Sequence, residues 1–218
     1  WQYYGVSLPF WRSYDKEDPR REFFYYDYTG DAKRDDQSDY GFHYMVPEEG
    51  VTVVPNDTTK YMQNVATMKY TYDMISDAYY DGRTICIFRL SDVILCKAEI
   101  ENNLNGPAAA LPYLNQIRAR AGAPEYGKHN RFPAPSTKEA MNDAILKERG
   151  YELVFEFQRR ADLIRFGKYE EVVNAHLKKL GIAQPTNVTS SLRYFPYPLN
   201  DAQLNPNLAA ENPSRLPK

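Results

Sequence analysis

Two glutamates four residues apart, Glu148 and Glu152, are the residues in this sequence best placed to do acid–base chemistry. Paired carboxylates cleave glycosidic bonds in glycoside hydrolases, but those pairs flank an open cleft at set separations. A spacing of four places both groups on one face of a single helix. We expect them to be buried and paired with arginines such as Arg118 and Arg120, because an unpaired buried carboxylate is costly. A glycoside hydrolase that uses Glu148 and Glu152 is the less favoured alternative.

A cluster of aromatic residues near the start of the chain is the second candidate site. Its members are Trp1, Tyr3, Tyr4, Trp11 and Tyr14. Flat, electron-rich rings stack on the C–H faces of sugars, while neighbouring polar groups hydrogen-bond the hydroxyls. We predict a ligand-binding platform here. The alternative for each ring is ordinary burial against the helices, since large aromatic residues dominate cores.

Other common catalytic signatures are missing from the sequence. None of the three histidines follows a glutamate by three residues, so a dinuclear carboxylate centre has no support. The two cysteines, Cys86 and Cys96, cannot form a zinc site alone. The Gly-x-Ser-x-Gly, P-loop and Gly-x-Gly-x-x-Gly patterns do not occur either. These absences remove several common enzyme signatures, and we expect no metal and no cofactor.

Composition narrows the possible partners. The 218 residues are 43% hydrophobic and 26% charged, which is typical of a folded globular protein. A net charge of −2 gives no general attraction to phosphate backbones, so nucleic acid is not an expected partner. The chain begins at Trp1 and its first methionine is Met45, so we expect that its natural start has been removed or that the chain is a fragment.

The pattern of the sequence divides the chain into two parts. Residues 1–82 are rich in aromatics and turn formers, and we predict loops and short hairpins there, with possible strands at 51–54 and 69–72. This part is a possible ligand-binding face. Residues 83–218 are predicted to be helical and to end in an extended tail, because prolines recur after Tyr194.

Four helices are predicted in the second part, at 90–104, 109–121, 136–155 and 168–180. The first presents an apolar face made of Leu90, Val93, Ile94, Ala98 and Ile100. The second is expected to begin near 109 because an interior Pro112 would break a regular helix. Ser136 and Glu139 form a capping box that opens the third, whose inward seam runs through Met141, Ile145, Glu148, Glu152 and Phe155.

Two antiparallel helix pairs indicate a mainly α fold of tetratricopeptide-like helical hairpins. Two hairpins are too few for a stable solenoid. We therefore expect further helices outside this chain, and exposed apolar surface where they dock.

Four ordered motifs resemble those of the SusD/RagB family of outer-membrane nutrient-binding lipoproteins. Residues 89–99 read RLSDVILCKAE, residues 110–122 read ALPYLNQIRARAG, and residues 148–165 read ERGYELVFEFQRRADLIR. The ending contains YPL at 197–199, NPNL at 205–208 and NP at 212–213. An earlier Asp18-Pro19-Arg20 is similar to a weaker landmark of the same family. The chain looks like the C-terminal portion of a member.

The resemblance implies a SusD-like α-α superhelix and a non-catalytic, cell-surface protein that binds a glycan. It implies delivery of the oligosaccharide to a SusC-like TonB-dependent transporter in a Bacteroidetes-type outer membrane. It also implies a lipid anchor on an N-terminal cysteine that this chain lacks, and a missing N-terminal portion of the same protein as a partner. A peptide-binding, RagB-like member of the family is the alternative.

Overall fold

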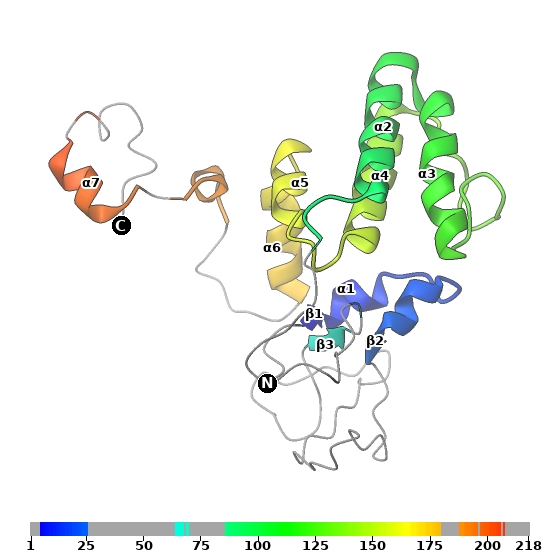
Figure 1. Ribbon diagram of the computed structural model, residues 1–218, viewed down its shortest axis with the longest axis horizontal. Helices are drawn as coiled ribbons and strands as arrows, with labels where there is room; N and C mark the ends of the chain where they lie inside the picture. The colour runs from blue at the N-terminus through cyan, green and yellow to red at the C-terminus, as the bar shows by residue number, and fades with distance from the viewer. Residues whose placement is uncertain are drawn as a thin grey trace, which may run out of the picture. The chain divides into compact units, whose positions relative to one another are not determined.

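The computed structural model describes residues 5–25, 64–67, 69, 86–179, 188–195, 197–205 and 207 (Figure 1). The chain divides into two compact units, Trp1–Arg159 and Arg160–Lys218, and each is described by itself. The boundary predicted between residues 82 and 83 lies outside the described residues and stays a prediction.

Three helices form the scaffold of the first unit: α2 (Leu90–Asn105), α3 (Pro107–Ala121) and α4 (Lys138–Glu152). Gly106 joins α2 to α3 with a φ of 88°, a conformation that L-residues rarely adopt, and Figure 1 shows the resulting hairpin. The interior between the three helices is apolar and fully buried: Leu95, Ala98, Ala110, Leu114, Ile117, Met141 and Ile145. The prediction of a mainly helical fold is confirmed.

The predicted start of α3 was wrong. The helix begins at Pro107, and Pro112 lies inside it. A proline removes the hydrogen bond to the carbonyl four residues earlier and crowds that carbonyl. Here that carbonyl belongs to Ala108 in the first turn, and Pro112 itself is exposed, so the disturbance stays near the helix start.

The face that α2 buries also differs from the prediction. Of the five predicted residues only Ala98 is buried, whereas Leu90, Val93 and Ile100 are 72%, 61% and 53% exposed. The buried face instead combines Leu95 and Ala98 with three polar residues, Ser91, Asp92 and Asn102. Hydrophobicity alone misidentifies this face because its polar members have partners: Asp92 pairs with Arg149 at 2.7 Å and Asn102 donates to Asn142 at 2.8 Å.

The long third helix ends earlier than predicted. Its N-cap is Thr137, whose hydroxyl accepts from the Ala140 N–H, and its last residue is Glu152. The chain then turns, with Phe155 and Phe157 at φ values of 61° and 62°. Phe155 therefore does not lie on the inward seam of the helix: from the turn, and half-buried, it packs against the aromatic cluster that contains Trp11 and Tyr14.

A small antiparallel sheet and two short helices make up the described part of the aromatic-rich segment. The elements are β1 (Gly5–Ser7), α1 (Leu8–Arg12), a 3-10 helix η1 (Pro19–Phe23), β2 (Phe24–Tyr25) and β3 (Asn64–Thr67). The strand order is β1-β3-β2, with Val6 opposite Val65 and Tyr25 opposite Ala66. The predicted strand at 51–54 and residues 70–72 of the predicted strand at 69–72 lie outside the described residues, and Lys69 itself lies in a bend just after β3.

The second unit contains most of α5 (Arg159–Arg165), then α6 (Tyr169–Lys179), a 3-10 helix η2 (Ser190–Arg193) and α7 (Leu199–Leu204). The predicted fourth helix corresponds to α6. The tail is not extended throughout, because α7 forms in the stretch between Pro198 and Pro206, where Pro198 occupies the N-cap and costs no helical hydrogen bond. None of the helices in the described residues is long and apolar enough to cross a bilayer.

Candidate functional site

Three carboxylates form a buried row along α4 and the turn that follows it. Glu148, Glu152 and Glu156 are 1%, 3% and 4% exposed. From the helical side, Arg118 of α3 contacts Glu148 (Nη1–Oε2, 2.7 Å) and Arg120 contacts Glu152 (Nη2–Oε1, 2.6 Å). The predicted pairing of Glu148 and Glu152 with these two arginines is confirmed.

A third arginine reaches the same carboxylates from the aromatic-rich segment. Arg20, in η1, donates through Nη1 to Glu148 (2.7 Å) and to Glu152 (3.0 Å). Asp18 holds the other edge of its guanidinium, at 2.9 Å from Nε and 2.7 Å from Nη2. Burial of a charge is tolerated when it is paired and hydrogen-bonded, and Arg20 meets both conditions. Arg20 thus joins η1 to α4.

Two further cations close the C-terminal end of α4. Arg89, just before α2, donates to Glu152 (Nη1–Oε1, 2.7 Å) and to Glu156 (Nε–Oε2, 2.8 Å). Lys69, just after β3, pairs with Glu156 and donates to the backbone carbonyls of Glu152 and Val154, both at 2.9 Å. The last carbonyls of a helix lack partners within it. Lys69 and Arg89 supply such partners to the carbonyl of Glu152, the last residue of α4, and thereby stabilise this helix end.

Cations outnumber the carboxylates around the row. Together with Asp18 the row makes a cluster of four carboxylates and five cations: Asp18, Glu148, Glu152 and Glu156 with Arg20, Lys69, Arg89, Arg118 and Arg120. Burial alone would raise the pKa of Glu152, but the Arg89 hydrogen bond and the charges of Arg89, Arg120 and Arg20 outweigh it and lower the pKa to about 2. A carboxyl with that pKa has no proton to donate near neutrality, so Glu152 is unsuited to general acid catalysis.

Sequence reasoning missed Arg20, Lys69 and Arg89. They come from irregular segments, 132, 83 and 63 residues from Glu152, where no helical period marks which side chains face inward. Two signals were available: Arg20 stands in the Asp18-Pro19-Arg20 landmark, and Arg89 opens the motif at residues 89–99.

The structure buries the two predicted platform residues that it describes. Trp11 is 5% exposed, and the guanidinium of Arg21 lies 4.1 Å from the centre of its ring. Tyr14 is 3% exposed, stacks on Tyr151 at a centroid distance of 4.2 Å and donates its hydroxyl to the Tyr151 carbonyl at 3.0 Å. These contacts support the alternative of core burial for both residues.

Trp1, Tyr3 and Tyr4 lie outside the described residues. The stacking platform as a whole therefore stays a prediction.

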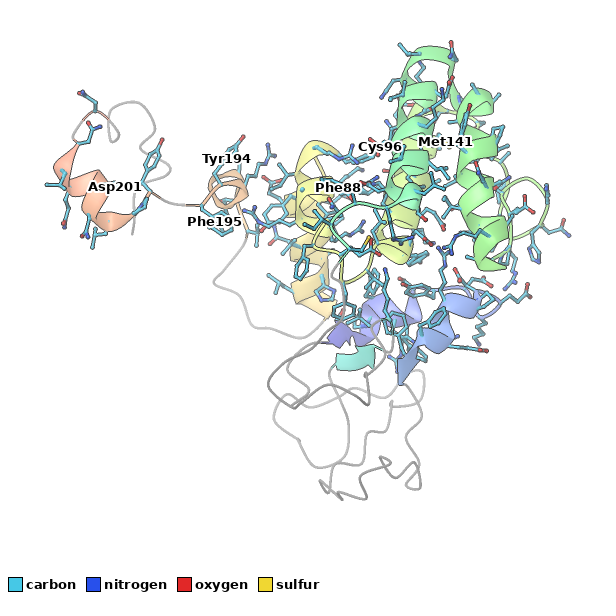
Figure 2. The ribbon with its side chains drawn as sticks, in the orientation of Figure 1. Phe88, Cys96, Met141, Tyr194, Phe195 and Asp201 are labelled. Carbon is cyan, nitrogen blue, oxygen red and sulfur yellow. The ribbon has the colours of Figure 1, made fainter. Side chains whose placement is uncertain are left out.

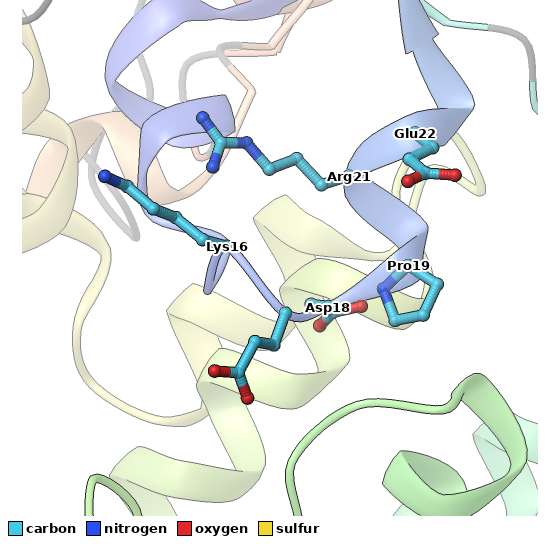
Figure 3. A pocket seen from close by; sticks show the side chains of 6 residues that line it. Lys16, Asp18, Pro19, Arg21 and Glu22 are labelled. Atoms are coloured by element: carbon cyan, nitrogen blue, oxygen red, sulfur yellow. The ribbon is translucent and has the colours of Figure 1, made fainter.

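A polar pocket of about 390 Å³ opens beside η1 (Figure 3). Its lining residues are Lys16, Glu17, Asp18, Pro19, Arg21 and Glu22. Such a lining offers hydrogen-bonding groups of both signs but no aromatic face, so it suits hydroxyls better than ring stacking. Part of the lining is already committed, since Asp18 holds Arg20 and Glu17 contacts Arg131 at 2.7 Å. Within the described ranges, no group of three or more His, Cys, Asp or Glu side chains is arranged to hold a metal ion.

The architecture is a scaffold of helical hairpins to which an irregular, aromatic-rich segment is bound by buried ion pairs. The model of the SusD family matches residues 7–214, and the chain belongs to that family. The SusD-like protein P25 of Formosa agariphila is 39% identical over 120 residues, which cover 55% of this chain and 22% of that protein. The starch-binding protein SusD of Bacteroides thetaiotaomicron is 28% identical over 137 residues, which cover 62% of this chain and 22% of that protein.

A solved structure, that of a SusD superfamily protein from Bacteroides vulgatus, aligns with a TM-score of 0.44 and 29% identity. The alignment covers 55% of this chain and 25% of that one. Each matched segment thus spans about a fifth to a quarter of the other protein's length.

Proposed function

We propose that this chain is the scaffold-bearing part of a non-catalytic, cell-surface glycan-binding protein that delivers oligosaccharide to a SusC-like TonB-dependent transporter. Membership of the SusD family supports the proposal, as does the name of one relative, starch-binding protein SusD. The observation that carries the non-catalytic part is the carboxylate row, in which each of Glu148, Glu152 and Glu156 contacts at least two cations.

Hydrolysis of a glycoside needs one carboxyl that holds a proton and a second that faces the sugar. Glu148 and Glu152 are both almost fully buried, and the pKa of Glu152 lies far below neutrality. Their role is to hold the aromatic-rich segment on the helices. In this proposal the ligand binds to Trp1, Tyr3 and Tyr4, while the buried Trp11 and Tyr14 pack in the core of the segment.

The same family relationship supports the proposed location. The protein is held at the outer surface of the outer membrane by a lipidated N-terminal cysteine, and the transporter is its partner there. A tethered binder raises the local concentration of ligand at the transporter, which is the physical advantage of linking the two.

The proposal is tested on this chain, by calorimetry against starch-derived oligosaccharides, other neutral glycans and peptides. We expect saturable glycan binding, lost in Trp1→Ala, and no release of reducing ends on prolonged incubation. Phe23→Ala is the control, because Phe23 is an exposed aromatic ring (55%) outside the predicted platform. Binding of peptides alone would favour the RagB-like alternative, and steady release of reducing ends would overturn the non-catalytic assignment.

A further inference from the structure

The polar pocket beside η1 has a basic side and an acidic side. Figure 3 shows the side chains of Lys16 and Arg21, which we call the basic side, extending to one side of the pocket, with Glu22 on the other. Lys16 and Glu22 are exposed and Arg21 is half-buried, so a dissolved ligand can reach all three. The volume of about 390 Å³ lies within the range of about 300–1,000 Å³ that is usual for small-molecule sites.

Two of the negative charges of the lining are neutralised by cations outside it, whereas the positive charges of the basic side are not. Asp18 is paired with Arg20 at 2.7 Å, and Glu17 is paired with Arg131 at 2.7 Å. By contrast, no carboxylate of the described residues pairs with either cation of the basic side. Two cations that share one side of a cavity and have no counter-charge attract an anion.

Arg21 is held in place by Trp11. The central carbon of its guanidinium lies 4.1 Å from the centre of the Trp11 ring, and Trp11 Nε1 donates to the Arg21 carbonyl at 3.4 Å. Trp11 is buried in the aromatic cluster, so it provides a fixed support. A cation–π contact uses none of the hydrogen-bond donors of a guanidinium, which stay available for an acceptor. Because Arg21 is already positioned, binding an anion costs it less conformational entropy.

We propose that this pocket binds a negatively charged sugar of the glycan ligand, with Arg21 and Lys16 contacting its carboxylate or sulfate group. The planar guanidinium donates two parallel hydrogen bonds to an oxyanion, and the ammonium adds a point charge. Glu22, on the opposite side of the pocket, accepts hydrogen bonds from the hydroxyls of the sugar. The inference rests on the proposed glycan-binding function, adds a site to the predicted platform and specifies that the glycan is anionic.

The lining favours a sugar over an acidic peptide as the carrier of the negative charge. Apart from Pro19, every lining residue is charged, so the pocket offers hydrogen-bonding groups to a ring of hydroxyls but little surface to an apolar side chain. The exposed ring of Phe88 (74%) lies elsewhere, just before α2 (Figure 2). A uronic acid and a sulfated sugar present the same chemistry to this lining, an oxyanion on a ring that carries hydroxyls.

The experiment measures, by calorimetry on this chain, the affinity for three matched trisaccharides. The first contains a glucuronic acid residue, the second is the same trisaccharide with that carboxyl reduced to an alcohol, and the third carries a sulfate ester on the reduced residue. We expect at least one charged trisaccharide to bind about tenfold or more tightly than the neutral one, and this advantage to shrink at high salt. A preference for the first identifies a uronic acid as the bound sugar, and a preference for the third identifies a sulfated sugar.

Two variants test whether the pocket causes the preference. Lys16→Gln and Arg21→Gln each remove one charge, and we expect each to reduce the tenfold advantage to about threefold or less. The affinity for the neutral trisaccharide should change less than about twofold in both variants, which shows that they remain folded. Lys178→Gln is the matched control, because Lys178 is an exposed lysine outside the lining of the pocket.

Four results would overturn the proposal. Equal affinities for the charged and neutral trisaccharides would show that there is no anion site, while glycan binding itself would stand. A preference for charge that is unchanged in both variants would place the anion site elsewhere. Tighter binding of an acidic tripeptide than of any trisaccharide, lost in the same variants, would make a peptide the occupant. Binding of none of the trisaccharides would contradict glycan binding by this chain, and this inference with it.

Discussion

Replacing Glu152 by glutamine removes one charge from the centre of the carboxylate row while keeping its shape. Glu152 accepts from Arg20 at 3.0 Å, from Arg89 at 2.7 Å and from Arg120 at 2.6 Å, and it is 3% exposed. The amide of glutamine still accepts a hydrogen bond but leaves three guanidinium groups without their shared counter-charge. We therefore expect Glu152→Gln to destabilise the folded protein.

The magnitude follows from the pKa of Glu152. A pKa lowered from its usual 4.5 to about 2 means that the folded state favours the ionised form by roughly 3 kcal/mol, at about 1.4 kcal/mol per pH unit. Part of that is weakened by solvent, because the Arg120 side chain is 57% exposed. We expect the free energy of unfolding to fall by about 2–4 kcal/mol, the usual range for breaking a buried ion pair.

Urea unfolding at pH 7, followed by tryptophan fluorescence, measures this change, with buried Trp11 as the reporter. The expected shift of the midpoint is about 1 M for a slope of about 2–3 kcal/mol per M. Glu171→Gln is the control, because Glu171 is 71% exposed and pairs with Lys168 at 3.5 Å, so its loss costs below about 0.5 kcal/mol. A Glu152→Gln protein as stable as the wild type would refute the reasoning, and so would the loss of a hydrolytic activity without loss of stability.

The same assay repeated at acid pH tests the sign of the effect. The pKa of Glu152 is lower in the folded state, so its contribution is fully present above the unfolded pKa near 4.5 and is lost as the pH falls toward 2. The difference between wild type and Glu152→Gln should therefore shrink from pH 5 to pH 2. A difference that stays constant over this range would show that the substitution acts through packing rather than through charge.

Two other substitutions test the contacts that seat the aromatic-rich segment. Tyr14→Phe removes the hydroxyl that donates to the buried Tyr151 carbonyl. We expect the free energy of unfolding, measured in urea, to fall by about 1–3 kcal/mol. No measurable change would mean that water replaces the hydrogen bond. Gly122→Ala places a methyl group 3.2 Å from Pro19 Cγ at a φ of 71°, whereas Gly167→Ala meets open space at a φ of 68°. Both substitutions should lower the free energy of unfolding by about 1–2 kcal/mol because of the left-handed backbone, and Gly122→Ala should lower it more. Equal losses would show that Pro19 moves aside without cost.

Helical periodicity predicted the scaffold because each helix repeats its inward positions. It placed Glu148 and Glu152 on one face and identified Arg118 and Arg120 as their partners, and both pairs are present. It failed for α2, where the polar residues Asp92 and Asn102 are buried and Leu90 is exposed. The helix has apolar residues on two faces, and helical periodicity does not tell which of the two is buried.

The ends of helices and the irregular segments were harder to predict, for a different reason. At the end of α4, two side chains distant in sequence, Lys69 and Arg89, donate to the carbonyl of Glu152, and no local signal in the sequence reports these contacts. Trp11 and Tyr14 were candidates for a surface platform because aromatic residues serve cores and sugar sites equally well. Only the contacts with Arg21 and Tyr151 distinguish the two roles.

In sequence, the carboxylate row resembles the catalytic pair of a glycoside hydrolase, because holding two segments together by ion pairs and catalysing a reaction place similar demands on carboxylates. Both need ionisable groups held at fixed separations in a poorly solvated place. The difference lies in what faces the carboxylates: an open cleft in a hydrolase, and here Arg20, Lys69 and Arg89 from three separate segments. Those segments have no amphipathic period with which to specify how they pack. We infer that ionic contacts to α4 and the turn after it define their position together with the packing of Tyr14 on Tyr151, so a charge change at Glu152 disturbs the aromatic-rich segment before it disturbs the helices.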